Sequence, residues 1–414
     1  MTRWYQDGEL RFAVGFEDTF VPQAGPGARA LDEYELTQHY HFWREDLTYA
    51  RDVGASMIRW GIPWYRVNPE RGRWDWSWLD QVVEHIHDLG LVTIVDLMHY
   101  GTPLWLDNQF VNAAYPELVA EYAARVAERY GDVLRDFTPL NEPMLNVLFC
   151  GQYGVWPPSL TGTDGFVKLL RAIVRGIVET QRAVAAVSPE ATFVHVEAAF
   201  RFDSTLPGRA AEVEFLRHRA LLVEDLVTGR VDAAHPLVGF LTANGFTDHD
   251  LAWSQANTAQ PDVMGVNYYP LLSTELLDEV DHVGSFADPR PRRNDWTAGL
   301  ADVLTTFAGR YDCPVFLTET CVTGTVEERL AWLDASVAEV RRLRSDGLDV
   351  VGYTWWPLTD MVEWTYREGT GRPMDHHLAM GLWDLVEDGA GVLRRVRNPV
   401  ADRFHAHARA ATAP

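Results

Sequence analysis

The segment Phe137-Thr138-Pro139-Leu140-Asn141-Glu142-Pro143 gives the first indication of how this chain folds. It is a short apolar run that follows a helix-like segment and stops at a proline, which is typical of a buried strand ending in an Asn-Glu pair. A carboxylate at the tip of a buried strand needs a partner or a task. Taken alone, Glu142 could cap the next turn or pair with an arginine.

A second segment far downstream ends in the same way. Pro314-Val315-Phe316-Leu317-Thr318-Glu319 is an apolar run that closes on a glutamate. Retaining glycoside hydrolysis requires two carboxylates at one place, one as proton donor and one as nucleophile. We therefore predict that Glu142 and Glu319 are the catalytic residues, with their carboxyl groups about 5–5.5 Å apart.

Eight apolar segments have the character of strands, and most are separated by helical patterns. They are residues 11–15, 56–62, 91–97, 134–140, 192–196, 263–267, 315–318 and 350–355. Eight alternating strand and helix units predict a parallel (β/α)8 TIM barrel with its chemistry at the carboxyl ends of the strands. With 414 residues, of which 47% are hydrophobic, we expect one catalytic domain over residues 1–414.

Local signals place helices and loops between these strands. Apolar residues from Leu79 to Leu89 fall on one helical face that Gly90 ends, and Pro116 begins another helix. Residues 272–296 and 365–380 fit neither pattern and follow strand ends, so we expect loops at the rim of a substrate entrance. A closing helix is expected after Asn398 and Pro399.

Composition excludes several classes of partner. The formal charge of −23 and the absence of a basic patch argue against nucleic acid or anionic membrane as a ligand. A solvated acidic surface is the plain explanation of this charge. The N-terminus lacks an apolar signal core and no run is long enough to span a bilayer, so we expect a cytoplasmic protein.

The sequence gives no sign of a metal or an organic cofactor. Cys150, Cys313 and Cys321 are sparse and have no metal-type spacing, which indicates free thiols in a reducing compartment. No clustered His, Cys and Asp spacing suggests a metal site either.

Polar and aromatic residues gather at the predicted carboxyl ends of the strands. Any one of them could be core packing or a satisfied buried histidine, and their convergence at one mouth is the informative feature. The set is Arg59, Trp60, His99, Tyr100, Asn141, Glu142, His195, Glu197, Asn267, Tyr268, Tyr269, Glu319, Trp355, Trp356, Glu363 and Trp364.

With these motifs in place, the chain resembles the family 1 glycoside hydrolases, the β-glucosidase and β-galactosidase family, over nearly its full length. The matching segments stand in the family's order. They are residues 46–69, His99-Tyr-Gly-Thr-Pro-Leu-Trp-Leu, Asn141-Glu142-Pro143 running on to Pro158, Gly265-Val-Asn267-Tyr-Tyr269, Leu317-Thr-Glu319 and Trp356-Pro-Leu-Thr-Asp-Met-Val-Glu363-Trp364.

The resemblance implies a role for each matching residue. It implies that Glu142 is the general acid and base, that Glu319 is the nucleophile, and that Arg59 and Tyr269 hold the nucleophile. It also implies that Asn141 binds the sugar 2-hydroxyl and that the sugar at the cleaved end is contacted by His99, Trp356, Glu363 and Trp364. We expect Tyr100 and Asn267 to bind substrate as well. The family logic agrees with simple electrostatics, because Arg59 favours an ionised Glu319, and a charged Glu319 favours a protonated Glu142.

The sequence also departs from the family pattern. The Gln-Ile-Glu-Gly motif that normally follows the first strand is missing, and Glu17, Asp18 or Gln23 could replace its glutamine. The tryptophan after the family's histidine is Tyr100, and Thr320-Cys321 follows the nucleophile in place of Asn-Gly. A phosphorylated sugar is disfavoured because the segment after Trp364 lacks the serine and lysine of the phospho-glycosidases, although Arg367 could bind an anion.

Together these features predict a retaining, exo-acting β-glycosidase that binds a small carbohydrate or glycoside and needs no cofactor. Two alternatives remain at this point. A transglycosidase would use the same two glutamates with a sugar or other alcohol as acceptor, and a sugar-binding barrel would have lost turnover.

Overall fold

Eight parallel strands close into a barrel in a computed structural model of the chain, which describes residues 3–23, 27–278 and 289–411. Neighbouring strands follow chain order around the barrel, and the last pairs with the first. The strands are β1 (Arg11–Gly15), β4 (Met57–Gly61), β5 (Val92–Asp96), β6 (Asp136–Thr138), β7 (Thr192–Ala198), β9 (Val263–Asn267), β11 (Val315–Thr320) and β12 (Val350–Trp355). The predicted strand segments and the TIM barrel are therefore confirmed.

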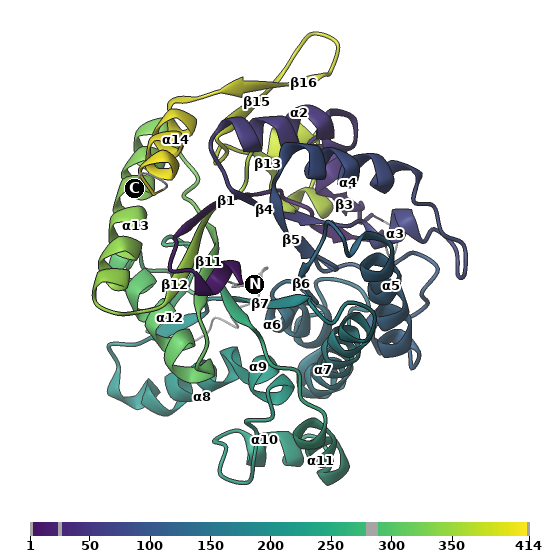
Figure 1. Cartoon of the computed structure of the whole chain (residues 1–414). Coiled ribbons are helices and arrows are strands. Elements are labelled where there is room, and N and C mark those ends of the chain that lie inside the picture. The colour runs from purple at the N-terminus through teal and green to yellow at the C-terminus, as the bar shows by residue number, and fades with distance from the viewer. Residues whose placement is uncertain (1–2, 24–26, 279–288, 412–414) are drawn as a thin grey trace.

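Helices surround the barrel as a ring (Figure 1). The ring contains α2 (His39–Asp52), α4 (Ser77–Leu89), α5 (Tyr115–Tyr130), α7 (Gly162–Val187), α8 (Ala210–Ala220), α9 (Leu222–Val227), α12 (Trp296–Tyr311), α13 (Val326–Ser345) and α14 (Pro399–Ala411). Farther from the barrel axis lie α10 (Val238–Ala243) and α11 (Asp248–Ala256).

The helix boundaries follow the local signals in the sequence. Gly90 ends α4 with a φ of 67°, a left-handed conformation that glycine adopts without the cost of a Cβ. Pro116 lies in the first turn of α5, where its missing N–H costs nothing. The side chain of Asn398 accepts a hydrogen bond from the Val400 N–H at 2.9 Å and caps α14.

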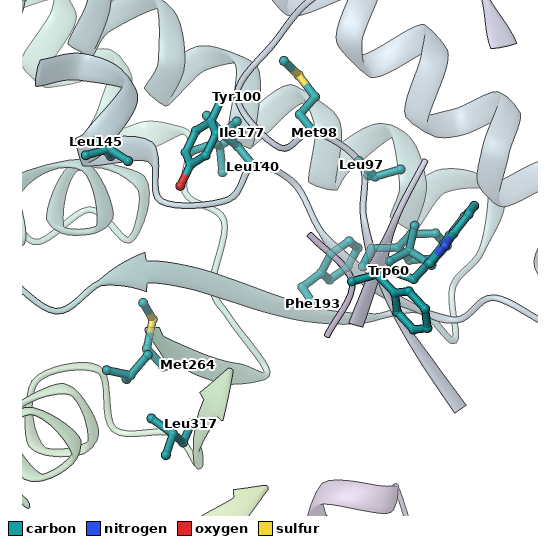
Figure 2. Close-up of a cluster of buried hydrophobic side chains, with 14 of the residues drawn as sticks. Trp60, Leu97, Met98, Tyr100, Leu140, Leu145, Ile177, Phe193, Met264 and Leu317 are labelled. Carbon is teal, nitrogen blue, oxygen red and sulfur yellow. The ribbon is translucent and has the colours of Figure 1, made fainter. Parts of the chain in front are cut away.

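One apolar core fills the space between the strands and the ring of helices. Leu79, Val82 and Ile86 of α4 are fully buried in it, as their spacing on one helical face predicts. Figure 2 shows part of the same cluster, in which the labelled side chains include Ile177 of α7 and strand residues such as Met264. This packing holds the strands, and hence the residues at their ends, in fixed positions.

The amino-terminal end of the barrel is closed by the short helix η1 (Trp4–Gln6). Tyr5 packs with Ala13 and Met57 inside the barrel, and the Trp4 indole N–H donates to Asp136 at 2.7 Å. Asp136 is the first residue of β6. The helix η1 therefore covers this end of the barrel, and the cavity described below opens at the opposite end.

Short elements build the rim at that end. They are α1 (Glu33–Leu36), α3 (Trp64–Val67), α6 (Pro143–Asn146), the π-helix η3 (Val147–Gln152), the 3-10 helices η2 (Gln109–Val111), η4 (Pro207–Arg209), η5 (Trp364–Arg367) and η6 (Pro373–His376), and the strand pairs β2 (Phe20–Val21) with β3 (Leu31–Asp32), β8 (Arg201–Asp203) with β10 (Thr274–Leu276), and β13 (Met361–Val362) with β14 (His377–Leu378). A hairpin of β15 (Trp383–Glu387) and β16 (Leu393–Arg397) projects beside α14.

The two predicted rim loops are partly ordered. The segment at 272–296 contributes β10, with residues 279–288 outside the described part of the chain, and the segment at 365–380 contributes η6 and β14. Leu272, Arg292, Leu378 and Met380 from these segments line the cavity described below. In the described ranges no helix has both the length and the apolar character needed to cross a bilayer.

Candidate active site

A cavity of about 430 Å³ opens at the carboxyl ends of the barrel strands. Its volume lies in the usual range for small-molecule sites, about 300–1,000 Å³. The predicted residues in its wall are His99, Tyr100, Glu142, Asn267, Tyr269, Glu319, Glu363 and Trp364. Arg59, Asn141 and Trp356 are almost completely buried and stand behind the wall, in contact with wall residues.

Glu319 belongs to β11, in register with Asn267 of the neighbouring strand β9. One of its carboxyl oxygens accepts a hydrogen bond from the Arg59 guanidinium, and the other accepts one from the Tyr269 hydroxyl at 2.6 Å. Its side chain is only 5% exposed. Two donors thus fix the orientation of a buried carboxyl group that faces the cavity.

Arg59 lies on β4 and is fully buried. Besides Glu319, its guanidinium donates to Asn141 Oδ1 at 2.6 Å and contacts Asp96 Oδ2 at 2.7 Å. A buried guanidinium is stable only when its donors meet acceptors and its charge meets carboxylates, and here both conditions hold. Arg59 therefore ties the ends of β4, β5 and β11 together.

Glu142 follows β6 and has a φ of 44°, a left-handed conformation that is uncommon for a residue other than glycine. Its backbone N–H donates to the Val196 carbonyl at 3.0 Å, which holds the turn against β7. One carboxyl oxygen accepts from the Asn267 amide at 2.9 Å, and the other accepts from the Tyr100 hydroxyl. Like Glu319, Glu142 is a buried carboxyl group oriented by two donors.

Tyr100 connects Glu142 to the hydrogen bonds around Asn141. Its backbone is also left-handed, with a φ of 79°, and its ring is 2% exposed. Its hydroxyl accepts a hydrogen bond from the Asn141 side chain at 3.0 Å and donates to Glu142. Backbone strain of this kind costs about 1–3 kcal/mol per residue and persists at sites where surrounding contacts impose it.

His99 lies between two aspartates and Asn141. Its Nδ1 is 2.8 Å from Asp18 and 3.2 Å from Asp96, and its Nε2 is 2.9 Å from the Asn141 amide nitrogen. The Asn141 oxygen already accepts from Arg59, so its nitrogen must donate to Nε2, which fixes the proton of the neutral ring on Nδ1. Burial lowers the pKa of His99, but Asp18 and Asp96 outweigh it and raise the pKa well above its ordinary value. The Asn141 amide nitrogen opposes this rise, because a protonated ring would bring two N–H donors together at Nε2.

Asp18, Asp96 and His99 are also the one group in the described ranges with metal-ligand atoms close together, within 4.8 Å of one another. The Arg59 guanidinium already occupies Asp96. A divalent cation at this point would face a fixed positive charge, so the donor set does not fit a metal.

Trp356 and Glu17 complete the inner end of the cavity. The Trp356 indole stacks on His99 with ring centres 5.7 Å apart, and its N–H donates to Glu17 at 2.8 Å. Glu17 lines the cavity, whereas Asp18 pairs with His99 and Gln23 is exposed. Of the three residues considered for the missing family glutamine, Glu17 is therefore the one that reaches the cavity.

Comparison with known proteins agrees with this geometry. The profile of the family described as glycosyl hydrolase family 1 matches residues 16–370. This chain belongs to glycosyl hydrolase family 1. The resemblance seen in the sequence is confirmed, and with it the prediction of a glycoside hydrolase.

Relatives in the family are distant in sequence. The aryl-phospho-beta-D-glucosidase BglC of Bacillus subtilis is 22% identical over 413 residues, covering 87% of this chain and 85% of the relative. The beta-glucosidase of an Agrobacterium species is 25% identical over 367 residues, covering 79% and 77%. The solved family 1 β-glucosidase from Thermotoga maritima has a TM-score of 0.79 at 18% identity, with 99% of both chains covered, and shares the fold.

The pKa of Glu319 does not follow the expectation that Arg59 keeps this carboxyl group ionised. Burial raises the pKa of Glu319 to about 8, and the Arg59 guanidinium opposes this effect without cancelling it. The expected influence of Arg59 is therefore present, but desolvation is larger. The nearby charge of Glu142 acts in the same direction as burial.

Five residues assigned to the mouth from the sequence lie elsewhere. The Trp60 indole N–H donates to His39 of α2 at 3.0 Å, and the Tyr268 hydroxyl donates to the Trp296 carbonyl at 2.8 Å. His195 faces the helices, where its ring nitrogens lie 2.8 Å from Glu224 and 2.7 Å from Gln181. Glu197 accepts from the backbone N–H groups of residues 198 and 144 at 2.9 and 3.1 Å, so it anchors α6 rather than lining the cavity. The indole N–H of Trp355 donates to a carbonyl in the core, that of Met380.

Asp96 and Thr318 are site residues that the sequence reasoning did not include. Asp96 pairs with Arg59, and the Thr318 hydroxyl donates to the Asn267 oxygen at 2.7 Å, which leaves the Asn267 amide nitrogen to face Glu142. A signal for Asp96 was present, because it is an acid at the end of a predicted strand. Cys321, whose position near the nucleophile was noted, does line the cavity as a buried free thiol.

Proposed function

We propose that this family 1 member is a retaining β-glycosidase that releases one sugar from the end of a small glycoside. The observation that carries the proposal is the pair Glu142 and Glu319, which face one cavity and are each held by two hydrogen-bond donors. Paired carboxyl groups of this kind perform glycoside hydrolysis without a cofactor.

In the proposed first step, a Glu319 oxygen attacks the anomeric carbon and forms a glycosyl ester. The bond to the aglycone oxygen breaks, and Glu142 delivers a proton to that oxygen. In the second step Glu142 takes a proton from water, the water oxygen attacks the anomeric carbon, and the ester to Glu319 breaks. The sugar leaves with its original configuration because the anomeric carbon is inverted twice.

The remaining wall residues have supporting roles in this proposal. Arg59 and Tyr269 hold Glu319 and stabilise its charge as the ester breaks. Asn267 and Tyr100 orient Glu142, and Asn141 links Tyr100 and His99 to Arg59. His99, Glu363 and Trp364 line the cavity and are positioned to contact the sugar, while Trp356 supports His99 from behind.

Two features narrow the substrate. Leu271 and Leu272 are 43% and 51% exposed and belong to the cavity wall, so the entrance favours an apolar or aromatic aglycone. Arg367, which could have bound a phosphate, is 2% exposed and donates to the carbonyls of Val21, Pro22 and Arg29. The name of BglC refers to phosphorylated substrates. In this chain the Arg367 guanidinium is engaged by these carbonyls and is not free to bind an anion at the cavity.

Azide provides the sharpest test of the two catalytic roles. With Glu319→Ala and an activated aryl β-glycoside, azide can attack the anomeric carbon directly from the vacated face, and we expect an α-glycosyl azide. With Glu142→Ala, azide attacks the ester to Glu319, and we expect the β-glycosyl azide. Without azide, Glu319→Ala should lower kcat by about 1,000-fold or more.

A matched control removes a glutamate that lies away from the cavity. Glu121 is exposed on α5 and pairs with Arg125 at 2.9 Å, so Glu121→Ala should keep wild-type turnover. Wild-type activity of Glu319→Ala would show that the nucleophile is assigned wrongly, and exchanged azide products would reverse the two roles. Disaccharide as the main product in the presence of added sugar would replace hydrolysis by transglycosylation.

A further inference from the structure

Glu17 places an additional carboxyl group in the cavity of the proposed glycosidase. It follows β1, it is 7% exposed, and it belongs to the cavity wall. Its two oxygens accept from the Trp356 indole N–H at 2.8 Å and from the Thr19 backbone N–H at 3.2 Å. Both donors are neutral, so neither one compensates a negative charge.

The surrounding cations are already used by other carboxylates. Arg59 contacts Asp96 and Glu319, and His99 contacts Asp18 and Asp96. Even with His99 protonated, two cations therefore face three carboxylates before Glu17 is added. Within the part of the chain that the structure describes, no Lys, Arg or His nitrogen lies within ion-pair distance of Glu17.

A second carboxylate in the wall lacks an ion-pair partner as well. Glu363 accepts from the Thr365 hydroxyl at 2.6 Å and makes no ion pair among the described residues. Glu275 differs, because Arg290 contacts it at 2.9 Å. The exposed Arg292 is the one arginine in the described cavity wall.

A series of three aromatic rings leads from Glu142 to Glu17 along the cavity. The Tyr100 hydroxyl donates to Glu142, and the Tyr100 ring contacts the His99 ring edge to face with centres 4.7 Å apart. The Trp356 indole stacks on His99 and donates to Glu17. A sugar ring with its anomeric carbon between the two catalytic glutamates directs carbons 3, 4 and 6 away from the cleaved bond.

From these contacts we infer that the glycone is an amino sugar with its ammonium group at carbon 3, 4 or 6, bound by Glu17. The inference rests on the proposed glycosidase function and names its substrate class. An ammonium group would donate charge-assisted hydrogen bonds to Glu17 and neutralise it, whereas a neutral sugar leaves a largely buried carboxylate without a counter-charge. The net excess of carboxylates in the wall favours the same cation.

The test compares 4-nitrophenyl β-glucoside with its 3-amino, 4-amino and 6-amino counterparts near neutral pH. Wild type should hydrolyse at least one amino glycoside with a kcat/KM about tenfold or more above that of the glucoside. Glu17→Gln keeps the shape and an acceptor for Trp356 but removes the charge, so it should lower this ratio by about tenfold or more. The exposed control Glu121→Gln should leave the ratio unchanged.

Failure of this inference differs from failure of the proposed function. If wild type prefers the glucoside to all three amino glycosides, or if Glu17→Gln leaves the ratio unchanged, the inference is wrong while the glycosidase stands. If folded wild type hydrolyses none of the glycosides, the function is wrong, and calorimetric titration decides the inference. The inference is supported if wild type binds a free amino sugar more tightly than glucose and Glu17→Gln loses this difference. Equal binding of the two sugars, or no binding, would overturn the inference.

Discussion

The Tyr100 hydroxyl offers a direct way to test how the proton of Glu142 is controlled. In Tyr100→Phe, Glu142 keeps the Asn267 amide as a donor at 2.9 Å but loses the hydroxyl. A hydrogen bond to a charged group contributes about 1.5–3 kcal/mol, and one pH unit corresponds to about 1.36 kcal/mol. The charged form of Glu142 should therefore be destabilised by an amount equal to about one to two pH units.

The direction of the effect follows from the proposed role of Glu142 as proton donor. Activity falls at high pH when the donor loses its proton, and a less stable carboxylate keeps its proton to higher pH. The basic limb of the kcat/KM profile of Tyr100→Phe should shift upward by about one to two units. Initial rates on an aryl β-glycoside across the pH range, fitted to a two-pKa curve, measure this shift.

A second tyrosine provides the control for the loss of a buried hydroxyl. Tyr122 is fully buried away from the cavity wall and donates to the Ile62 carbonyl at 3.3 Å. Tyr122→Phe should lower the unfolding free energy by about 1 kcal/mol and leave the pH profile unchanged. Equal profiles for wild type and Tyr100→Phe, or equal shifts in both variants, would refute the assigned role of Tyr100.

Further predictions concern the nucleophile and its support. Arg59→Lys should reduce kcat/KM by about 100-fold or more, because one ammonium group cannot contact Asp96, Asn141 and Glu319 together. The same substitution should lower the unfolding free energy by about 3 kcal/mol, measured from a melting curve. Tyr269→Phe removes one donor to Glu319 and should lower kcat by about tenfold in steady-state assays while the fold, checked by circular dichroism, is kept. Since burial raises the pKa of Glu319 to about 8, activity should fall as pH decreases through values well above the ordinary 4.5; an acidic limb at or below about 4.5 would contradict this.

The strands and the catalytic candidates could be predicted because both depend on short-range patterns. Apolar runs that end in polar residues identified the strands, and the carboxyl ends of parallel strands necessarily share one end of a barrel. Glu142 and Glu319 therefore meet at one cavity although they are far apart in the chain. The assignment of Arg59 and Tyr269 as partners of Glu319 came from the resemblance to the family motifs. The spacing of these residues in the sequence does not provide it.

The error at β7 has a clear physical origin. Successive side chains of a barrel strand alternate between the interior and the helix layer. Val194 and Val196 pack inside the barrel, so His195 and Glu197 must face outward. The alternation was visible in the sequence, and applying it would have removed both residues from the predicted mouth.

Other features depend on contacts that one sequence does not reveal. Asp96 ends β5 and His99 follows three residues later, whereas Asp18 comes from the segment after β1 and reaches them only in the folded barrel. The same holds for Glu17, whose position beside Trp356 brings residues 17 and 356 together across the pairing of β1 with β12. Sequence reasoning could nominate Glu17 for the missing family glutamine, but only the fold separates it from Asp18.

The distribution of charge separates Glu17 from the partners of Glu319. One buried cation, Arg59, pairs with both Glu319 and Asp96. Glu17 does not contact this cation, and its own hydrogen-bond donors are neutral. A change at Glu17 alters the charge offered to the substrate without removing a partner from Glu319. Under the proposed function, a substitution at Glu17 is therefore expected to change the choice of sugar while the contact between Arg59 and Glu319 remains.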